Sequence, residues 1–481
     1  MVSVTGAPAT VIVVHEDWHG GAGNGLGTLY AFQKACIKGS AAGVDIKAKL
    51  AAGASVAIYH TAGKGTRLAP LPGAENNNKP GVKLPSLLQI KDAFEPITVL
   101  EAVMRQTSSY GPVRGGRVSV FWGDQVFVPS AGIKASEHHA DILAALRPMP
   151  TKSEWESEEL HQYGLIAVDS KGDAMQLEKV TYEVATKYLP EDIISVGTSL
   201  GSFSMSASLI DALLDEFSSE LIAKTASYDS DPHFWMPFTL KREDYIAVMG
   251  KKETDAETAG EHYDRMAAFR TKFKPDGGCI LGCVDVGRGA YWWDYGRLAL
   301  YFEYNQHVTE DSPSAHALRT FLRLEPKRCQ SNKNGETLET DSHSVVLNCK
   351  LGSGRVGPSC VLVGVSAPSI DVEGCVLINV SSNTHIYGRH GLLYNVVHES
   401  DEGAATPLTA DEDGGYVRAD VFMPGKHVQM CSKLSIDGGK VWKVPVQDNE
   451  MSFEGVYKAN QPLDPSECSA LAKAAHARLR K

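Results

Sequence analysis

A glycine-rich segment with three basic residues is the part of this chain whose residue types most directly suggest chemistry. The apolar run 56–59 predicts a buried strand, and a glycine turn at 63–67 follows it. Glycine lets backbone approach a ligand closely, and successive N–H groups in such a turn cradle phosphate oxygens. Arg67 could add a bidentate phosphate contact, and Lys79 and Lys83 bring further positive charge. The segment predicts a site that handles the phosphates of a nucleoside triphosphate.

Two aspartates each follow a strand-like run. Asp124 comes soon after the run 117–120, and Asp294 comes after an aromatic pair, Trp292 and Trp293. The carboxyl ends of strands are where open α/β sheets bind ligands. Mg²⁺ is usually held by one or two carboxylates together with phosphate oxygens. Asp124 could therefore hold Mg²⁺, although either aspartate alone could also be a turn or capping residue.

The glycine turn fits neither of two common phosphate-binding motifs. A P-loop needs its lysine after the second glycine, and the dinucleotide fingerprint needs a third glycine. The pattern G-x-G-T-R-L-x-P with the later K-P and K-L-P, all within 63–85, resembles the signature of sugar-1-phosphate nucleotidyltransferases. The W-x-D-x-G element at 292–296 is similar to the element of that family whose aspartate supplies the second metal ligand.

The resemblance implies an Mg²⁺-dependent enzyme that joins a nucleoside triphosphate (NTP) to a sugar-1-phosphate, giving a nucleoside diphosphate (NDP) sugar and pyrophosphate. The charged catalytic residues of this enzyme would be Arg67, Lys83 and Lys79, and the metal ligands would be Asp124 and Asp294. Lys83 is preferred over Lys79, because residues 82–85 match a family G-K-[IV]-L-x-P element. The residues expected to bind the nucleotide are Gly25, Gly27, Thr28, Gly63, Gly65, Thr66 and Gly123.

The sugar phosphate is assigned, again by resemblance, to a second set of residues. A Y-G-L run at 163–165 leads to Glu178 and Lys179, which match a family Glu-Lys pair that contacts the sugar and its phosphate. Val180 replaces the proline usual after that pair, and Ser199 stands where the family usually has asparagine. The residues expected to bind the sugar phosphate are Gly164, Glu178, Lys179 and Ser199.

The N-terminal glycine-rich element narrows the resemblance. Residues 19–28 are similar to an element of the fucokinase/GDP-fucose pyrophosphorylase group, and 60–63 and 82–85 match that group in order. We expect the loop 20–28 to line the base or ribose pocket, with a GDP-sugar or a UDP-sugar as product. Thr66 and Asp294 look more like the simpler bacterial enzymes, and no kinase domain follows.

The elements that must position these residues suggest an α/β protein with a Rossmann-like nucleotidyltransferase domain over 1–325. Its sheet is expected to be mainly parallel. The residue pattern changes after residue 344, where small and aliphatic residues recur at short intervals. This pattern predicts a hexapeptide-repeat left-handed β-helix over 344–460, and a β-sandwich is the alternative. Residues 326–343 read as a linker, and 461–481 as a C-terminal helix. The predicted strands are 11–14, 56–59, 118–122 and 165–168, and the predicted helices are 28–37, 99–108, 207–217 and 256–273.

The charge and the apolar content of the chain limit the kinds of molecule that it can bind. The net charge of −11 disfavours a nucleic acid, whose phosphates attract basic surfaces. No apolar run reaches membrane-spanning length, so we expect a cytoplasmic protein without a membrane partner. The β-helix could support a homo-oligomer. Two other functions remain open: a non-catalytic regulatory subunit, and a bifunctional enzyme whose β-helix is an acyltransferase with His385 or His390 as base.

Overall fold

The computed structural model of the protein describes residues 9–61, 63–90, 93–400, 408–411 and 413–480. Contacts divide the chain into two compact units, each discontinuous in sequence. The first unit comprises Met1–Ala62, Arg105–Trp122 and Val128–Tyr291; the second comprises Gly63–Met104, Gly123–Phe127 and Trp292–Lys481. The predicted domains, in contrast, are continuous stretches of sequence, and their boundaries stay a prediction.

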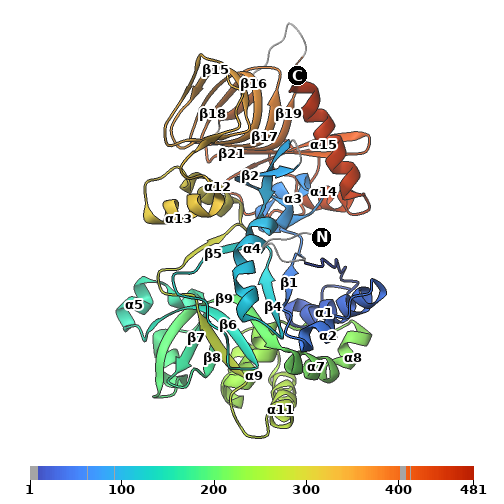
Figure 1. The fold of residues 1–481 in the computed structure, drawn as a ribbon, viewed down its shortest axis with the longest axis vertical. Coiled ribbons are helices and arrows are strands. Elements are labelled where there is room, and N and C mark those ends of the chain that lie inside the picture. Colours follow the sequence, from blue (N-terminus) through green and yellow to red (C-terminus); the bar gives the residue numbers. More distant parts are fainter. Residues whose placement is uncertain (1–8, 62, 91–92, 401–407, 412, 481) are drawn as a thin grey trace. The chain divides into compact units, whose positions relative to one another are not determined.

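The first unit is built on a seven-stranded sheet whose strands run in both directions (Figure 1). Its main path has the order β1-β4-β9-β6-β10, with β7 on β9 and β8 on β7. β1 is parallel to β4 and β6 to β10, whereas β9 is antiparallel to β4, β6 and β7. The strands are β1 (Val56–His60), β4 (Arg117–Trp122), β6 (Ala140–Pro148), β7 (Gly164–Asp169), β8 (Ala174–Glu178), β9 (Ile193–Ser206) and β10 (Leu281–Asp285).

Helices pack against this sheet and share an apolar core with it. Leu26 and Leu29 of α1, Leu209 and Leu213 of α7, and Val120 of β4 are all buried in it. Ser206 and Asp255 cap α7 and α11 by accepting backbone N–H bonds. The helices are α1 (Gly23–Ala41), α2 (Ile46–Ala51), α5 (Lys152–Ser157), α6 (Tyr182–Tyr188), α7 (Ala207–Glu216), α8 (Ser218–Ala223), α9 (Met236–Thr239), α10 (Arg242–Gly250) and α11 (Ala256–Phe273), with short helical turns at η3 (Ser108–Val113), η4 (Leu160–Gln162) and the π-helix η5 (Asp231–Trp235).

The mixed α/β class is confirmed, but two local predictions are wrong. Residues 11–14 form no strand. The sheet is not mainly parallel, because β7 continues into β8 after only four residues and a parallel connection needs a dozen or more. The predicted strands at 56–59, 118–122 and 165–168 correspond to β1, β4 and β7, and the predicted helices at 207–217 and 256–273 to α7 and α11.

In the second unit, the glycine turn lies among short helices and strands. The antiparallel pair β2 (Lys83–Ile90) and β3 (Ala93–Thr98) follows it, and β5 (Gln125–Val128) pairs with β11 (Tyr291–Asp294). Among the elements before the stack are η1 (Thr66–Leu68), α3 (Leu71–Ala74), η2 (Lys79–Gly81), α4 (Val99–Thr107), α12 (Leu298–His307) and α13 (Pro313–Leu322).

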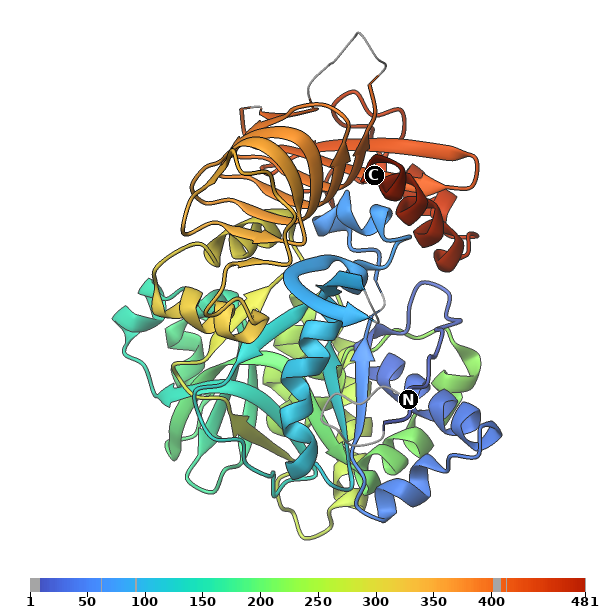
Figure 2. The same ribbon diagram turned by 45° about the horizontal axis from the view of Figure 1, so that its top comes forward.

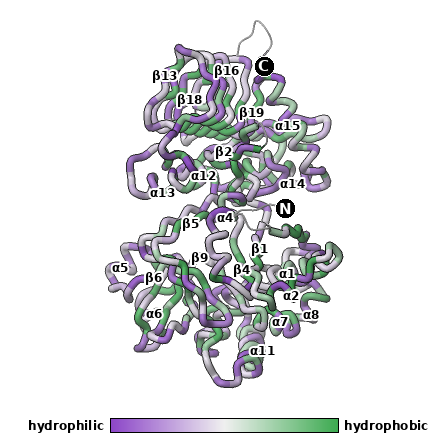
Figure 3. Tube along the Cα trace, viewed as in Figure 1, coloured by the Kyte–Doolittle hydropathy of each residue, from purple (hydrophilic) through white to green (hydrophobic). Residues whose placement is uncertain are grey.

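The rest of the second unit is a stack of parallel coils, which Figure 2 shows as successive arcs. Val345 pairs with Val361, Val361 with Val376, and Val376 with Leu392, so each coil takes 15 or 16 residues. Hydrophobic stretches recur along the stacked strands in Figure 3. Buried side chains from these strands form a separate core. The strands are β12 (Cys329–Gln330), β13 (Leu338–Thr340), β14 (Val345–Leu347), β15 (Lys350–Val356), β16 (Val361–Glu373), β17 (Val376–Ser382), β18 (Ile386–Arg389), β19 (Leu392–His398), β20 (Leu408–Asp411), β21 (Tyr416–Met423) and β22 (Lys426–Lys433).

Stacked parallel coils are the arrangement of a β-helix, and the left hand of its turn stays a prediction. The coil length is not a multiple of six, so the hexapeptide interpretation does not describe the observed period. The predicted linker at 326–343 is wrong, because it contains β12 and β13, which pair with β14 and β15. The chain ends in α14 (Phe453–Asn460) and α15 (Pro465–Leu479). Within the described residues, no helix combines the length and apolarity needed to cross a membrane.

Candidate functional site

A lysine and two aspartates converge in the second unit. Asp124 lies in the turn before β5, and Asp294 is the last residue of the partner strand β11. The Tyr295 N–H donates to the Asp124 carbonyl oxygen at 3.1 Å, which joins the ends of the two strands. Lys79, which begins η2, forms an ion pair with Asp124 Oδ2, and both side chains are less than a fifth exposed. The predicted metal ligands therefore lie together with one predicted catalytic lysine.

Gly296 explains how these groups come so close. Its N–H donates to Asp294 Oδ1 at 2.8 Å. A Cβ at this position would lie 2.7 Å from Asp124 Oδ2, 2.9 Å from Asp294 Oδ1 and 3.4 Å from Lys79 Nζ. The two carboxylate oxygens are thus no farther apart than the sum of the first two distances. Any side chain at 296 would fill the space into which both carboxylates and the ammonium point. We call this group the Gly296 cluster: Lys79, Asp124, Asp294 and Gly296.

The glycine turn has the backbone that its sequence predicts. Gly63 and Gly65 have φ angles of 109° and 63°, which L side chains rarely adopt. A Cβ at Gly65 would lie 3.1 Å from Lys79 Cβ, so this glycine also lets η2 approach the turn. Thr66 and Arg67 follow in η1, with Arg67 exposed. The turn therefore presents its arginine to solvent and packs directly behind the lysine of the Gly296 cluster. Ala62, part of the matched 60–63 element, lies outside the described residues.

Lys83 has a different partner from Lys79. Its Nζ lies 3.4 Å from Glu75 Oε2. Its backbone N–H donates to the Tyr394 hydroxyl at 2.9 Å, and the Tyr301 hydroxyl donates to its carbonyl oxygen at 2.6 Å. The Tyr394 hydroxyl in turn donates to Glu75. Of the two candidate lysines, the one that joins the aspartates is Lys79. The sequence-based preference for Lys83 rested on motif register alone.

Helix α14 contacts the segment that precedes Lys79, which sequence reasoning did not foresee. Asn460 Nδ2 donates to the Gly73 carbonyl oxygen at 2.8 Å, and Asn77 Nδ2 donates to the Tyr457 carbonyl oxygen at 2.7 Å. Lys64 lies over the Tyr457 ring, 5.7 Å from its centroid. Two hydrogen bonds between residues almost 400 positions apart thus hold the segment before Lys79, and no local pattern could reveal them.

The predicted sugar-phosphate residues also meet, in the first unit. A Cβ at Gly164 would lie 3.1 Å from Glu178 Oε2 and 4.0 Å from Ser199 Cβ. Ser199 Oγ accepts the Gly201 N–H at 3.1 Å, within strand β9. Lys179 is exposed, with its Nζ 4.0 Å from Glu178 Oε1. Lys252, which no sequence pattern had singled out, lies closer to the same oxygen, at 3.8 Å.

The N-terminal glycine element is a helix, which corrects the expected loop over 20–28. From Gly23 onward it belongs to α1, where Gly25 and Gly27 are buried. The Gly25 N–H donates to the Tyr228 carbonyl oxygen at 2.8 Å. The Thr28 hydroxyl donates to the Asn24 carbonyl oxygen at 2.7 Å and lies 2.8 Å from His60 Nε2. Burial lowers the pKa of His60 to about 4, which leaves its ring neutral. These glycines allow close packing, and their predicted contact with a base stays a prediction.

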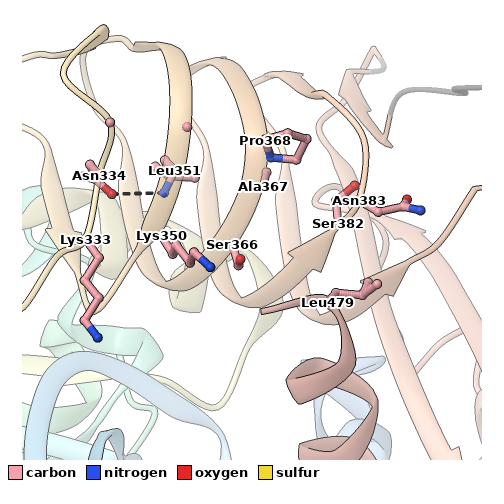
Figure 4. A pocket seen from close by; sticks show the side chains of 12 residues that line it. Lys333, Asn334, Lys350, Leu351, Ser366, Ala367, Pro368, Ser382, Asn383 and Leu479 are labelled. Carbon is pink, nitrogen blue, oxygen red and sulfur yellow. Dashed lines mark hydrogen bonds between the residues drawn. The ribbon is translucent and has the colours of Figure 1, made fainter. Parts of the chain in front are cut away.

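A cavity of about 500 Å³ lies along one edge of the coil stack (Figure 4). Equivalent positions of successive coils line it, including Lys333, Lys350 and Ser366, and Asn334 Oδ1 accepts the Leu351 N–H at 3.1 Å. Neither His385 nor His390 is among its lining residues. His385 Nδ1 lies 2.8 Å from Ser369 Oγ. The cavity therefore gives the acyltransferase alternative no base.

The Gly296 cluster has the donors that Mg²⁺ prefers. Within the described part of the chain, no three or more His, Cys, Asp or Glu side chains form a metal-binding group. A magnesium ion that is completed by substrate phosphates needs only one or two carboxylates. Asp124 and Asp294 supply these, and the glycine at 296 keeps the space between them free of a side chain. The residues present therefore fit an ion bound together with its substrate.

Comparisons with known proteins give no family assignment. No protein-family model matches the chain, and no curated protein matches it. Among solved structures, one described as mannose-1-phosphate geranyltransferase from Thermus thermophilus is similar, with 14% identity and a TM-score of 0.29. The match covers 85% of this chain and 98% of that one. At this TM-score the likeness supports no argument about function.

Proposed function

We propose that the protein is a sugar-1-phosphate nucleotidyltransferase, which forms an NDP-sugar and pyrophosphate from an NTP and a sugar-1-phosphate. The observation that carries the proposal is the convergence of Lys79, Asp124 and Asp294 around Gly296. These residues lie far apart in sequence, in three segments that the motif pattern had singled out independently. A non-catalytic protein with the same fold would have no physical reason to keep a lysine and two aspartates this close together.

In the proposed reaction the sugar phosphate oxygen attacks the α-phosphorus of the NTP, and pyrophosphate leaves. Both reactants are polyanions, so the protein needs to align them and neutralise charge rather than supply a nucleophile. We assign Lys79 to the α-phosphate, because its ammonium pairs with Asp124 while the start of its side chain packs against Gly65 of the glycine turn. The exposed Arg67 and the N–H groups of Gly63, Gly65, Thr66 and Gly123 are proposed to bind the outer phosphates.

Asp124 and Asp294 are proposed to hold Mg²⁺. When bound, the ion would neutralise part of the negative charge on the two phosphate groups and so lower the repulsion between them. Without it, Lys79 is the only cation paired with Asp124 in the described structure. Lys83, paired with Glu75 and fixed by two tyrosines, is assigned a supporting role in shaping the segment.

The sugar phosphate is assigned to the residues around Gly164. The Glu178 carboxylate is suited to accept hydrogen bonds from sugar hydroxyls, and Lys179 and Lys252 provide positive charge for the phosphate. The base is proposed to be guanine, with uracil next, on the motif resemblance of residues 19–28.

A matrix of the common NTPs against a panel of sugar-1-phosphates, read by pyrophosphate release, tests the proposal. We expect one strongly preferred pair and dependence on Mg²⁺. Binding of an NTP without turnover of any pair would support a regulatory subunit instead. Acetyl transfer from acetyl-CoA to an amino-sugar phosphate would support the bifunctional alternative.

A further inference from the structure

The cavity of about 500 Å³ along the coil stack has no part in the proposed nucleotidyltransferase reaction (Figure 4). Its volume falls within the range of about 300–1,000 Å³ that is common for small-molecule sites. All of its lining residues belong to the second unit, and none of them is in the Gly296 cluster or the glycine turn. The cavity is therefore a candidate for a second binding site.

Four successive coils contribute to the wall of this cavity. The Lys333 N–H donates to the Cys349 carbonyl oxygen at 2.8 Å, so Lys333 lies one coil before Lys350. Lys350 pairs with Ser366 on the following coil, and the coil after that contributes Asn383. Neighbouring strands lie about 4.8 Å apart, so the wall extends for about 14 Å along the stack. A small molecule can therefore contact several coils at once.

Two glycines leave part of the wall as bare backbone. A Cβ at Gly335 would lie 2.0 Å from the Gly352 carbonyl oxygen, and a Cβ at Gly352 would lie 2.2 Å from the Pro368 carbonyl oxygen. The close approach of the coils thus excludes a side chain at both positions. The hollow is a consequence of how the coils stack, and a ligand can approach the backbone there.

The charge of the cavity is positive. Lys333 and Lys350 are both exposed, so solvent and solutes can reach their ammonium groups. The Lys350 ammonium also donates to the Arg480 carbonyl oxygen at 3.1 Å, which helps to orient it. None of the described lining residues is an aspartate or a glutamate. Because the whole chain has a net charge of −11, this local positive charge does not reflect a general excess of basic residues.

The two lysines suit a phosphate group, and the rest of the wall suits hydroxyl groups. A phosphate offers several strong acceptor oxygens, and two ammonium groups on adjacent coils can donate to them together. Farther along the stack the wall carries the Ser366 hydroxyl and the Asn383 amide, and both kinds of group can donate and accept. None of the described lining residues is aromatic, so the wall offers no stacking surface for a base.

We propose that this cavity binds a hydroxyl-bearing organic phosphate, that is, a sugar phosphate or a polyol phosphate. Lys333 and Lys350 bind its phosphate, and Ser366 binds one of its hydroxyl groups. The site is independent of the proposed function, because it uses none of the residues assigned to the nucleotidyltransferase reaction.

Calorimetry of the full chain tests the site, with glucose 6-phosphate, ribose 5-phosphate and glycerol 3-phosphate as probes. We expect at least one of the three to bind saturably, and its affinity should fall as the salt concentration rises. Glucose, ribose and glycerol, which lack the phosphate, should not bind. Inorganic phosphate should bind more weakly than that probe, because it lacks the hydroxyl-bearing part.

Variants locate the binding. Lys333→Gln and Lys350→Gln should each lower the affinity about tenfold or more, since each removes a charge-assisted hydrogen bond. Ser366→Ala should lower the affinity for the organic phosphate about two- to tenfold and leave that for inorganic phosphate unchanged. Lys327→Gln is the matched control, because Lys327 is an exposed lysine of the same unit that does not line the cavity. It should bind as the wild type does.

The Lys79→Ala variant separates this site from the Gly296 cluster, and it should keep the binding of the organic phosphate. Three results would overturn the proposal: no saturable binding of any of the three probes, binding that survives in a Lys333→Gln/Lys350→Gln double variant, or binding that Lys79→Ala abolishes. Equal affinities for inorganic phosphate and the organic phosphates would overturn the hydroxyl-binding part. Urea unfolding of Lys333→Gln should match the wild type, because the substitution changes an exposed side chain.

Discussion

Replacing Gly296 by alanine should disable the Gly296 cluster while leaving the fold in place. The added methyl group would lie 2.7 Å from Asp124 Oδ2 and 2.9 Å from Asp294 Oδ1, and real Cβ atoms essentially never show contacts below 3.0 Å. Both carboxylates must therefore move. Overpacking of this kind costs about 1–3 kcal/mol of folding free energy.

The catalytic cost should be larger than the structural one. Loss of one preorganised charge contact lowers kcat by about 100- to 1,000-fold, and Gly296→Ala disturbs two carboxylates and their lysine together. We expect kcat for pyrophosphate release to fall by at least about 100-fold, which corresponds to about 2.7 kcal/mol in the barrier. The Mg²⁺ concentration at half-maximal rate should rise, because the same carboxylates are proposed to hold the ion.

Pyrophosphate release at saturating substrates, with an Mg²⁺ titration and urea unfolding of the same preparations, measures all three quantities. Gly132→Ala is the control, because a Cβ there meets no atom within 4 Å. It should match the wild type. A Gly296→Ala enzyme with wild-type kcat and Mg²⁺ dependence would refute the reasoning, since the cluster could not then be the site of charge neutralisation.

Three further predictions follow from other contacts. Lys79→Ala should lower kcat and kcat/KM together by about 100- to 1,000-fold and Lys83→Ala by much less, because only Lys79 pairs with Asp124; steady-state kinetics that give the opposite ranking would return the main role to Lys83. Tyr394→Phe removes the buried hydroxyl that accepts the Lys83 N–H, so the free energy of unfolding in urea should fall by about 1–3 kcal/mol; an unchanged value would show that water replaces the hydroxyl. Burial raises the pKa of Asp231 to about 7 in the folded protein from an ordinary value of 3.8, so ionisation opposes folding and stability should decline as pH rises from about 4 through 7. Asp231→Asn should flatten that decline in urea titrations at several pH values, and a decline that persists in the variant would assign it to another group.

Part of this site could be predicted from the chain alone. Strands β1 and β4, the glycine turn and the two aspartates were predicted because local periodicity and positive-φ glycines leave direct marks in sequence. The convergence of Asp124 with Asp294 followed only from resemblance, since 170 residues separate them.

Other features depend on tertiary contacts that leave no local signal. The backbone of Lys83 is held by Tyr301 and Tyr394, hundreds of residues away. The N-terminal glycines read as a loop, but α1 forms there because glycine permits close approach to the backbone of Tyr228.

The most direct test of the central claim follows the α-phosphate. The protein is given an NTP radiolabelled at its α-phosphate, the preferred sugar-1-phosphate and Mg²⁺, and the products are separated. The proposed reaction places the label in an NDP-sugar and releases unlabelled pyrophosphate, and the Asp124→Asn/Asp294→Asn double variant should yield neither product. Label recovered in a nucleoside monophosphate or retained in the NTP, or a double variant as active as the wild type, would contradict the account.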